Sequence, residues 1–445
     1  MEKVSSVKDI VLLFEKYSTE SRNLHKSFVV AGKSYTAVVI EEDGFLEDGV
    51  ISVFGSFLGG MTEGKPRYFN QVVAPKFWEI SGNNTSGKIH NLNHERARIF
   101  YAEPKHKRFV KDVDWLDDKG VVRVSDHYNK YGYLYAKTMF NGKGQKVTKT
   151  YYDGDGKEVV VRNYVTGDII LNDGPKIRFF KNIQKFVEFF LEKNDMINSR
   201  IFYNTLAMPF SVSHHLPSVH KEDMLFWNEP IGNEVPGNMQ LILHGNSPRT
   251  EKIMVQRRDA YEKLIELGVD SSKIEKLGYC YDFQKENTYK KQALICTNSD
   301  NIAHCAKLIE ALPDMHFHIA AITEMSSKLM AMGSYDNVTL YPGIKASRVK
   351  DLFKKCDYYF DINYGSEILS AVWTAFLHNH AIFAFDETVH NQMYIPKEHI
   401  YAVGDVDKLI ENVKMLMNDK AKVGEYIEVQ KAYAMSESVN KYQNI

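Results

Sequence analysis

The chain has 445 residues and a formal net charge of −1 at pH 7, which excludes electrostatic attraction to nucleic acid as its main mode of binding. No run of about 18 apolar residues occurs, so we expect no transmembrane segment. The length predicts two or three domains, and 26 tyrosines with 25 phenylalanines favour β-rich structure. The N-terminus has no apolar segment of signal-peptide length, so we expect a cytoplasmic protein.

The first 65 residues predict the start of an α/β domain. An amphipathic helix is expected from about Val7 to Tyr17, packed within the domain rather than on a membrane. A buried strand is expected at residues 35–41.

A series of turn glycines then predicts an antiparallel meander from about residue 66 to residue 180. The glycines recur every twelve residues and are Gly120, Gly132, Gly144 and Gly156, with Gly167 after eleven more. Polar residues precede each glycine, and short segments rich in Val, Tyr, Phe and Thr separate them. Residues 67–73, 97–102 and 108–115 are expected to extend the same sheet. One face is predicted to be solvated or to meet a partner, because Arg123, Lys137, Lys149 and Arg162 share it.

The remaining chain predicts alternating strands and helices of two Rossmann-like units. A helix is expected at residues 182–193, with strands at 200–204, 223–227 and 238–244, so the meander is an insertion in the first unit. The second unit is expected from about residue 270. Its predicted strands are 274–279, 292–297, 315–321, 357–361 and 381–386, and its predicted last helix is 419–435. In such units ligands bind at the carboxyl ends of the strands.

The four cysteines, all in the second half of the chain, have no metal or redox spacing and are expected as buried thiols. The sequence has no G-x-x-x-x-G-K-S, C-x-x-C or G-x-S-x-G motif. We therefore expect no metal and no cofactor.

Residues 357–386 resemble, without a gap, the nucleotide-sugar site of retaining GT-B glycosyltransferases. In that family two Glu residues eight positions apart, with a glycine-rich turn between them, hold the donor. Here Ser366 and Thr374 stand at the two acidic positions, and the turn glycines are replaced. A shift of one residue would make Glu367 the first acid, but Ala375 would then be its partner. The resemblance implies a preserved fold without donor chemistry.

A second donor element is also missing. GT-B enzymes usually carry Gly-Arg and a nearby Lys after the first strand of the second domain, and these cations neutralise the diphosphate. Here residues 297–301 read Thr-Asn-Ser-Asp-Asn, and no cation occurs before Lys307. A diphosphate without these partners is strongly disfavoured. Two missing elements predict a non-catalytic subunit.

Strings along the whole chain resemble one family, GtfB. They include residues 13–17, 38–46, 113–117, 151–155 and 225–230. GtfB is the accessory, stabilising subunit of the GtfA–GtfB O-GlcNAc transferase of Gram-positive bacteria, which accompanies the accessory Sec system. The resemblance implies that the partner GtfA supplies the donor site and transfers GlcNAc from UDP-GlcNAc to Ser/Thr of a serine-rich repeat adhesin. It also implies that this chain holds the acceptor, in the cytoplasm or peripherally at the cytoplasmic face of the membrane.

The predicted organisation is GT-B-like. Its parts are residues 1–65 and 181–268 as the N-terminal Rossmann-like domain, 66–180 as the inserted meander, 269–418 as the C-terminal Rossmann-like domain and 419–445 as a helix crossing back to the first domain. The predicted acceptor-binding residues are polar groups assigned to strand ends: His244, Asn246, Arg249, Arg257, Asn363, Tyr364 and Glu367. The predicted partner-docking residues, all in the meander, are Trp115, Arg123, Tyr128, Tyr131, Tyr133 and Arg162.

Two alternatives stay open. The first is an active transferase whose atypical donor site uses Glu367 and the remaining arginines. The second is a chaperone or sugar-binding module that acts without an enzyme partner.

Overall fold

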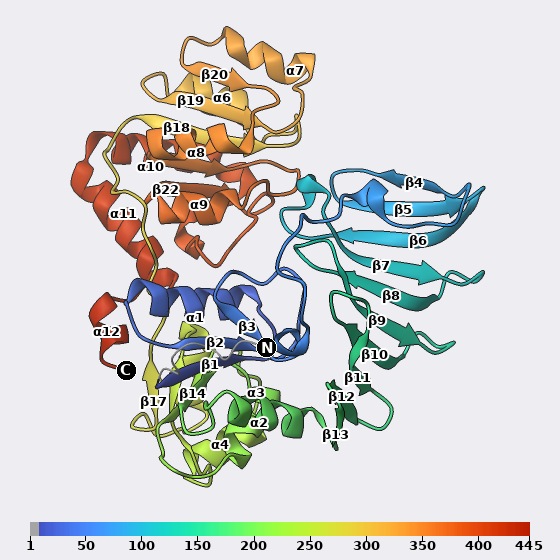
Figure 1. Cartoon of the computed structure of the whole chain (residues 1–445). Coiled ribbons are helices and arrows are strands. Elements are labelled where there is room, and N and C mark those ends of the chain that lie inside the picture. The colour runs from blue at the N-terminus through green and yellow to red at the C-terminus, as the bar shows by residue number, and fades with distance from the viewer. Residues whose placement is uncertain (1–8) are drawn as a thin grey trace. The chain divides into compact units, whose positions relative to one another are not determined.

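The computed structural model describes residues 9–445, which form two compact units (Figure 1). The first unit comprises residues 9–28 and 33–276, and the second comprises residues 29–32 and 277–445. The first unit holds a seven-stranded sheet and a ten-stranded sheet, and the second unit holds a six-stranded sheet. Among the residues described, no helix is both long enough and apolar enough to cross a membrane.

The seven-stranded sheet is parallel throughout and has the order β17-β16-β15-β14-β1-β2-β3. Its strands are β1 (Ile10–Phe14), β2 (Thr36–Val39), β3 (Val50–Ser52), β14 (Arg200–Tyr203), β15 (Asp223–Trp227), β16 (Thr250–Val255) and β17 (Ile274–Lys276). Its helices are α1 (Thr19–Val30), α2 (Ile183–Lys193), α3 (Met208–His215), α4 (Gly237–Leu243) and α5 (Arg258–Glu266). Because the strands are parallel, all their carboxyl ends meet at one edge.

The helix predicted at Val7–Tyr17 is wrong, because Ile10–Phe14 forms the interior strand β1, between β14 and β2. Val7 itself lies outside the described residues. All five residues of β1 are buried, as expected for a strand covered on both faces. A short, continuous apolar run does not distinguish such a strand from a buried helix.

Two further predictions in this unit are wrong. Residues 238–244 form most of helix α4, whose buried Met239 and Ile242 are three positions apart on one helical face, and the strand comes later as β16. Strand β17, predicted for the second unit, pairs with β16 through Ile274 and Ile253 and so belongs to the first sheet.

The antiparallel meander is confirmed, with ten strands that pair in chain order. They are β4 (Glu79–Gly82), β5 (Ser86–Asn91), β6 (His94–Tyr101), β7 (Val110–Leu116), β8 (Val122–Tyr128), β9 (Leu134–Phe140), β10 (Lys146–Tyr152), β11 (Glu158–Asn163), β12 (Ile169–Asp173) and β13 (Lys176–Phe180). The strand predicted at residues 67–73 is wrong, because a single helical turn, η2 (Phe69–Gln71), occupies it.

The five predicted turn glycines all have positive φ, between 73° and 88°. Each turn begins with an Asp or Asn whose Oδ1 accepts two backbone N–H groups. Asp117, for example, accepts from Lys119 at 2.9 Å and from Val121 at 3.0 Å. The same acceptor role is taken by Asn129, Asn141, Asp153 and Asn163. The twelve-residue period is therefore one strand plus one Asx turn closed by glycine.

The meander shares a hydrophobic core with the parallel sheet. Tyr151 of β10 stacks on Phe54, with ring centroids 4.6 Å apart. Arg162 of β11 pairs with Glu41 at 2.5 Å, so it points at the parallel sheet's loops and not at solvent. Lys149 is only 8% exposed. The predicted four-residue cationic face is therefore wrong, because these two residues lie against the core.

The six-stranded sheet of the second unit is parallel and has the order β20-β19-β18-β21-β22-β23. Its strands are β18 (Gln292–Thr297), β19 (His316–Ala321), β20 (Val338–Tyr341), β21 (Tyr358–Asp361), β22 (Ala381–Phe385) and β23 (Ile400–Tyr401). Its helices are α6 (Cys305–Ala311), α7 (Ser327–Met330), α8 (Ala346–Lys355), α9 (Ala371–Leu377), α10 (Val406–Asn418), α11 (Lys420–Tyr433) and α12 (Val439–Gln443). All four cysteines are buried and free, as predicted.

Candidate functional site

The carboxyl edge of the second unit's sheet is closed by its own loops. The loop after β18 and the loop after β21 run side by side, with Ile302 bridged to Asn363. Ala303 N donates to Ile362 O at 2.8 Å, and Tyr364 N donates to Asn301 O at 3.0 Å. These backbone bonds join the two loops between which the sequence places a donor site.

Asn363 cross-links these loops from the inside. Its Oδ1 accepts from Thr297 Oγ1 at 2.9 Å and from Gly365 N at 3.0 Å. Its Nδ2 donates to Asn298 Oδ1 at 3.3 Å, and the side chain is 2% exposed. Asn298 Oδ1 also fills the place that a side chain at Gly365 would need. Asn363 therefore serves the fold and has no surface for an acceptor.

His390 fastens the second loop to the end of strand β21. Its Nδ1 lies 2.6 Å from Asp361 Oδ1, its backbone N donates to Asp361 Oδ2 at 2.8 Å, and its Nε2 lies 2.7 Å from Gly365 O. The hydrogen bond to the buried Asp361 carboxylate raises the pKa of His390 to about 9. The imidazolium form, which donates from both nitrogens, therefore holds Gly365 against the sheet at neutral pH.

Neither acidic position of the donor motif carries a carboxylate. Ser366 is exposed, and Thr374 Oγ1 donates back to Ser370 O at 2.9 Å within its own helix. Glu367 Oε1 accepts from Val372 N at 2.9 Å at the start of α9, and burial raises the pKa of its carboxyl. Glu367 therefore caps a helix, and the notion that it is free to serve an acceptor is wrong.

The backbone before α9 keeps a conformation that glycine favours. Leu369 and Ser370 have φ values of 54° and 48°, and Leu369 occupies one of the two turn-glycine positions. Non-glycine residues pay roughly 1–2 kcal/mol for this left-handed region. The turn is therefore left-handed although neither Leu369 nor Ser370 is a glycine.

The carboxyl edge of the first unit's parallel sheet, by contrast, opens onto a cavity of about 490 Å³, here called the strand-end pocket. Loops after β1, β14, β15 and β16 line it. Its lining residues include Glu15, Ser21, Asn204, Asn228, Glu229 and Arg257. Asn204 Nδ2 donates to Ser21 Oγ at 3.0 Å, whereas the enclosed Asn228 Nδ2 has no hydrogen-bond partner among residues 9–445. An enclosed amide donor without a partner would be satisfied by a ligand carbonyl or hydroxyl.

Of the predicted acceptor residues, Arg257 lines this pocket, where it pairs with Asp259 at 2.6 Å. His244 and Asn246 are exposed at the opposite edge of the sheet, in the turn between α4 and β16. Their assignment to a strand's carboxyl end is wrong, because the predicted strand 238–244 is a helix. Tyr364, in the second unit, is 39% exposed and donates to Glu387.

Arg249 also lies at the opposite edge and is fully buried. Its guanidinium bonds to Asp223 Oδ2 at 3.0 Å and to three backbone carbonyls, of which Ser199 O is the nearest at 2.6 Å. The prediction that Arg249 binds an acceptor is therefore wrong, since its donors are used inside the fold.

Sequence reasoning missed Asn204, Asn228 and Glu229, which follow strands β14 and β15 directly. Both strands were predicted, so the rule that ligands bind at strand carboxyl ends could have found these residues.

The predicted docking residues are spread over different environments. Tyr128 is 4% exposed, and Arg162 is ion-paired inward. Trp115 Nε1 donates to Asp126 at 2.9 Å on a partly covered face. Arg123 keeps 46% of its side chain exposed. On the edge strand β13 and its neighbour β12, exposed apolar side chains are Ile170, Ile177 and Phe179, which are 38%, 77% and 63% exposed.

Models of four protein domains match successive parts of the chain. They are the GtfB N-terminal domain at residues 11–57, the GtfB middle domain at 78–181, the GtfB third domain at 183–267 and the GftB/GlyA-F C-terminal domain at 293–430. The UDP-N-acetylglucosamine–peptide N-acetylglucosaminyltransferase stabilizing protein GtfB of Streptococcus pneumoniae serotype 4 (strain ATCC BAA-334 / TIGR4) is 41% identical over 437 residues, 98% of each chain. The chain belongs to the GtfB family.

Other relatives agree with this membership. The stabilizing protein GtfB of Streptococcus gordonii is 41% identical over 439 residues, which are 98% of this chain and 97% of the relative. A chain in the crystal structure of the GtfA/B complex bound to UDP and GlcNAc has a TM-score of 0.90, 40% identity and 98% coverage of both chains. The pneumococcal O-GlcNAc transferase GtfA has a TM-score of 0.50 at 11% identity, with 98% and 97% of the two chains covered, which shows a shared fold alone. The fold of this GtfB-family chain is GT-B-like, with an inserted antiparallel sheet.

Proposed function

We propose that this chain is the non-catalytic, acceptor-binding subunit of a protein O-GlcNAc transferase. In this proposal a GtfA-type partner transfers GlcNAc from UDP-GlcNAc to Ser/Thr of a serine-rich repeat adhesin, and this chain holds the acceptor and stabilises the partner. Membership in a family of stabilizing proteins supports it, as does the relative solved in a GtfA/B complex.

The non-catalytic role is supported mainly by the loops at the carboxyl edge of the second unit's sheet, whose polar groups are hydrogen-bonded to one another. Asn363 bonds to both Thr297 and Asn298 where a nucleotide diphosphate would need donors and cations. Ser366 and Thr374 offer no carboxylate. An active site built on Glu367 is disfavoured, because that carboxylate already caps α9.

The acceptor side of the proposal rests on the strand-end pocket of the first unit. A Ser/Thr-rich polypeptide is disordered and poor in apolar anchors, so it must be held through hydroxyl and peptide groups. Asn204, Asn228, Glu229 and Arg257 provide donors and acceptors of this kind. Each contact contributes about 0.5–1.5 kcal/mol, so binding is weak at any one point.

We propose that the partner subunit docks on the meander at strands β12 and β13, rather than at the residues predicted from the sequence. Strand β13 is an edge strand, and Ile177 and Phe179 expose large apolar side chains on it. An unpaired edge with exposed apolar groups suits a similar sheet in a partner subunit of like fold. Arg123 on β8 and Tyr133 in the hairpin after β8 lie five strands from β13 and stay outside this surface.

The turnover experiment compares UDP-GlcNAc consumption on a Ser/Thr-rich peptide by this chain alone, by the partner alone and by both together. We expect no turnover by this chain and the highest turnover by the pair. Transfer by this chain above a partner-contamination control would contradict the non-catalytic role. Equal turnover by the partner with and without this chain would favour a separate chaperone.

The docking experiment uses Ile177→Asp with Phe179→Asp, and co-purification with the partner is the readout. We expect loss of the complex with an unchanged melting temperature of this chain. The matched control is Val165→Asp, since Val165 is 74% exposed in a turn rather than on the edge strand. Intact co-purification of the double variant would contradict the docking surface.

A further inference from the structure

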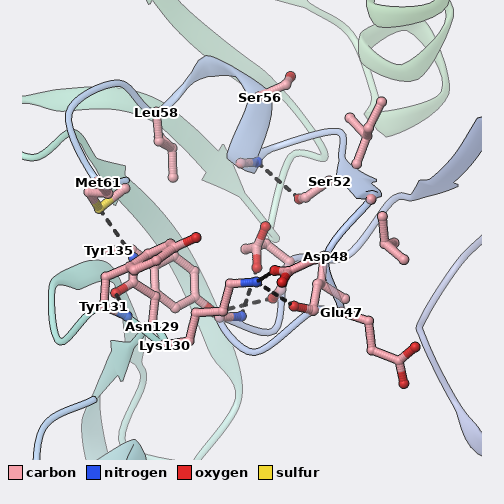
Figure 2. A pocket seen from close by; sticks show the side chains of 17 residues that line it. Glu47, Asp48, Ser52, Ser56, Leu58, Met61, Asn129, Lys130, Tyr131 and Tyr135 are labelled. Carbon is pink, nitrogen blue, oxygen red and sulfur yellow. Dashed lines mark hydrogen bonds and ion pairs between the residues drawn. The ribbon is translucent and has the colours of Figure 1, made fainter. Parts of the chain in front are cut away.

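A second cavity lies further along the same carboxyl edge of the parallel sheet. It measures about 390 Å³ and lies between the loops after β2 and β3 and the meander hairpin that joins β8 to β9 (Figure 2). We call it the hairpin pocket. Its lining includes Glu42, Ser52, Met61, Asn129, Lys130 and Tyr131.

The rim of the hairpin pocket is held in place by the protein itself. Lys130 Nζ donates to Asp48 Oδ1 at 2.6 Å and to Leu46 O at 2.9 Å, which ties the hairpin to the loop after β2. Gly44 approaches the backbone of Tyr128 so closely that a side chain there would clash. The cavity is therefore held in shape by contacts between the loops of the parallel sheet and the meander hairpin.

The walls of the hairpin pocket combine polar and aromatic groups. Asn129 Nδ2 donates to Met61 Sδ at 3.5 Å, which is a weak acceptor, so a peptide carbonyl would be a better partner. The Tyr131 ring forms one side of the cavity in Figure 2. Burial raises the pKa of the Glu42 carboxyl, whose Oε1 accepts from Gly44 N at 2.7 Å.

The two pockets lie along a single line across the sheet. The strand-end pocket covers the ends of β16, β15, β14 and β1, and the hairpin pocket covers the ends of β2 and β3. Glu47 lines the hairpin pocket and accepts from Tyr17, which lies in the loop after β1 that also lines the strand-end pocket. Five strand spacings from β16 to β3 measure about 24 Å, and an extended peptide covers that distance with about seven residues.

We infer that the acceptor polypeptide lies extended across the carboxyl edge of the parallel sheet, from the strand-end pocket to the hairpin pocket. This inference rests on the proposed acceptor binding and adds a second subsite with a minimum footprint. Peptides shorter than about seven residues reach one pocket only, and longer ones reach both. Affinity should therefore rise steeply near that length and change little beyond it.

The test measures binding of fluorescent Ser/Thr-rich peptides, about four to about fourteen residues long, to the full chain by anisotropy. The key variant is Asn129→Asp. Aspartate keeps the Asx turn, as Asp117 and Asp153 do in neighbouring hairpins, but it removes the amide donor and adds a charge. We expect long peptides to bind roughly tenfold more weakly, with short peptides unaffected.

Matched controls distinguish an effect on the hairpin pocket from a general effect on the hairpin's structure. Asn141→Asp makes the same change in an exposed turn outside the pocket, and it should bind every peptide as the wild type does. Tyr131→Ala should also weaken long-peptide binding, whereas Tyr133→Ala, on the same hairpin but outside the lining, should not.

The outcomes distinguish this inference from the proposed function. If affinity is flat from short to long peptides, or if Asn129→Asp and Tyr131→Ala bind long peptides normally, the second subsite is wrong while acceptor binding stands. If no peptide of any length binds the wild-type chain, both proposals fail.

Discussion

The two parallel sheets of this chain end in opposite ways. In the second unit the loops after β18 and β21 are joined by backbone bonds and by Asn363, so their polar groups satisfy one another. In the first unit the loops after β14 and β15 line a cavity and leave Asn228 Nδ2 without a partner among the described residues 9–445. The polar groups at the carboxyl edge of the second unit's sheet are thus hydrogen-bonded within the protein, whereas the carboxyl edge of the first unit's sheet has polar groups that a ligand could bind.

This difference follows from the need of buried polar groups for hydrogen-bond partners. Where no ligand supplies these partners, the loops themselves must do so. His390 and Asp361 do so at the closed edge. The predictions that follow test whether each edge is closed or open as described.

The largest effect is expected at the opposite edge of the first unit's sheet. Arg249→Met leaves Asp223 buried without its cation and should destabilise the first unit by about 3–5 kcal/mol. Arg257→Met, the matched control at the open edge, should change stability by less than about 0.5 kcal/mol but weaken acceptor binding. Urea unfolding and peptide anisotropy measure the two effects. Normal stability of Arg249→Met would mean that this arginine is not structural.

A smaller effect is expected for His390 and depends on pH. Its pKa, about 9 in the folded chain, lies above the ordinary 6.5, so its stabilisation is present below pH 6.5 and is lost as pH rises through 9. His390→Gln should therefore cost on the order of 2 kcal/mol at pH 6 and much less near pH 10. Thermal melts of the wild type and of His390→Gln from about pH 6 to about pH 10 measure this difference in stability. A pH-independent difference would show that the charge of His390 does not hold the loop.

A gain is expected at the turn before α9. Ser370 has positive φ and an exposed side chain without a capping bond, so Ser370→Gly should stabilise the chain by about 0.5–1 kcal/mol. Ser366→Gly, in the same loop without positive φ, is the control and should not stabilise. Melting temperatures compare the two, and equal shifts would remove the argument from backbone strain.

The smallest effect is expected when glutamate is placed at the two acidic positions of the donor motif, Ser366 and Thr374. Ser366→Glu with Thr374→Glu should leave UDP-GlcNAc binding undetectable by calorimetry, because residues 297–301 still lack a cation and Asn363 still joins the loops. The catalytic partner serves as the positive control. Saturable binding by the double variant would mean that the closed edge opens readily.

The sequence predicted the meander and its turns because these depend on local signals, whereas the missing donor groups were predicted through the resemblance of residues 357–386 to a known nucleotide-sugar site. A glycine with an Asx residue three or four positions earlier specifies its turn without any tertiary contact. A helix was predicted where strand β1 lies, and a strand was predicted where helix α4 lies. Both segments are short and apolar, and the secondary structure of such segments depends on the sheet around them. The roles of Arg249 and Glu367 could not be predicted, because both depend on partners distant in space or on loop geometry.

The repeated hairpin has a consequence for how such a protein can change its length. One twelve-residue unit adds one strand and reverses the chain direction, so a single insertion would send the following helix to the wrong end. Only pairs of units keep the direction, and each pair widens the sheet by about 10 Å. The meander can therefore lengthen only in steps of two strands if the helix that follows it is to begin at the same end of the sheet.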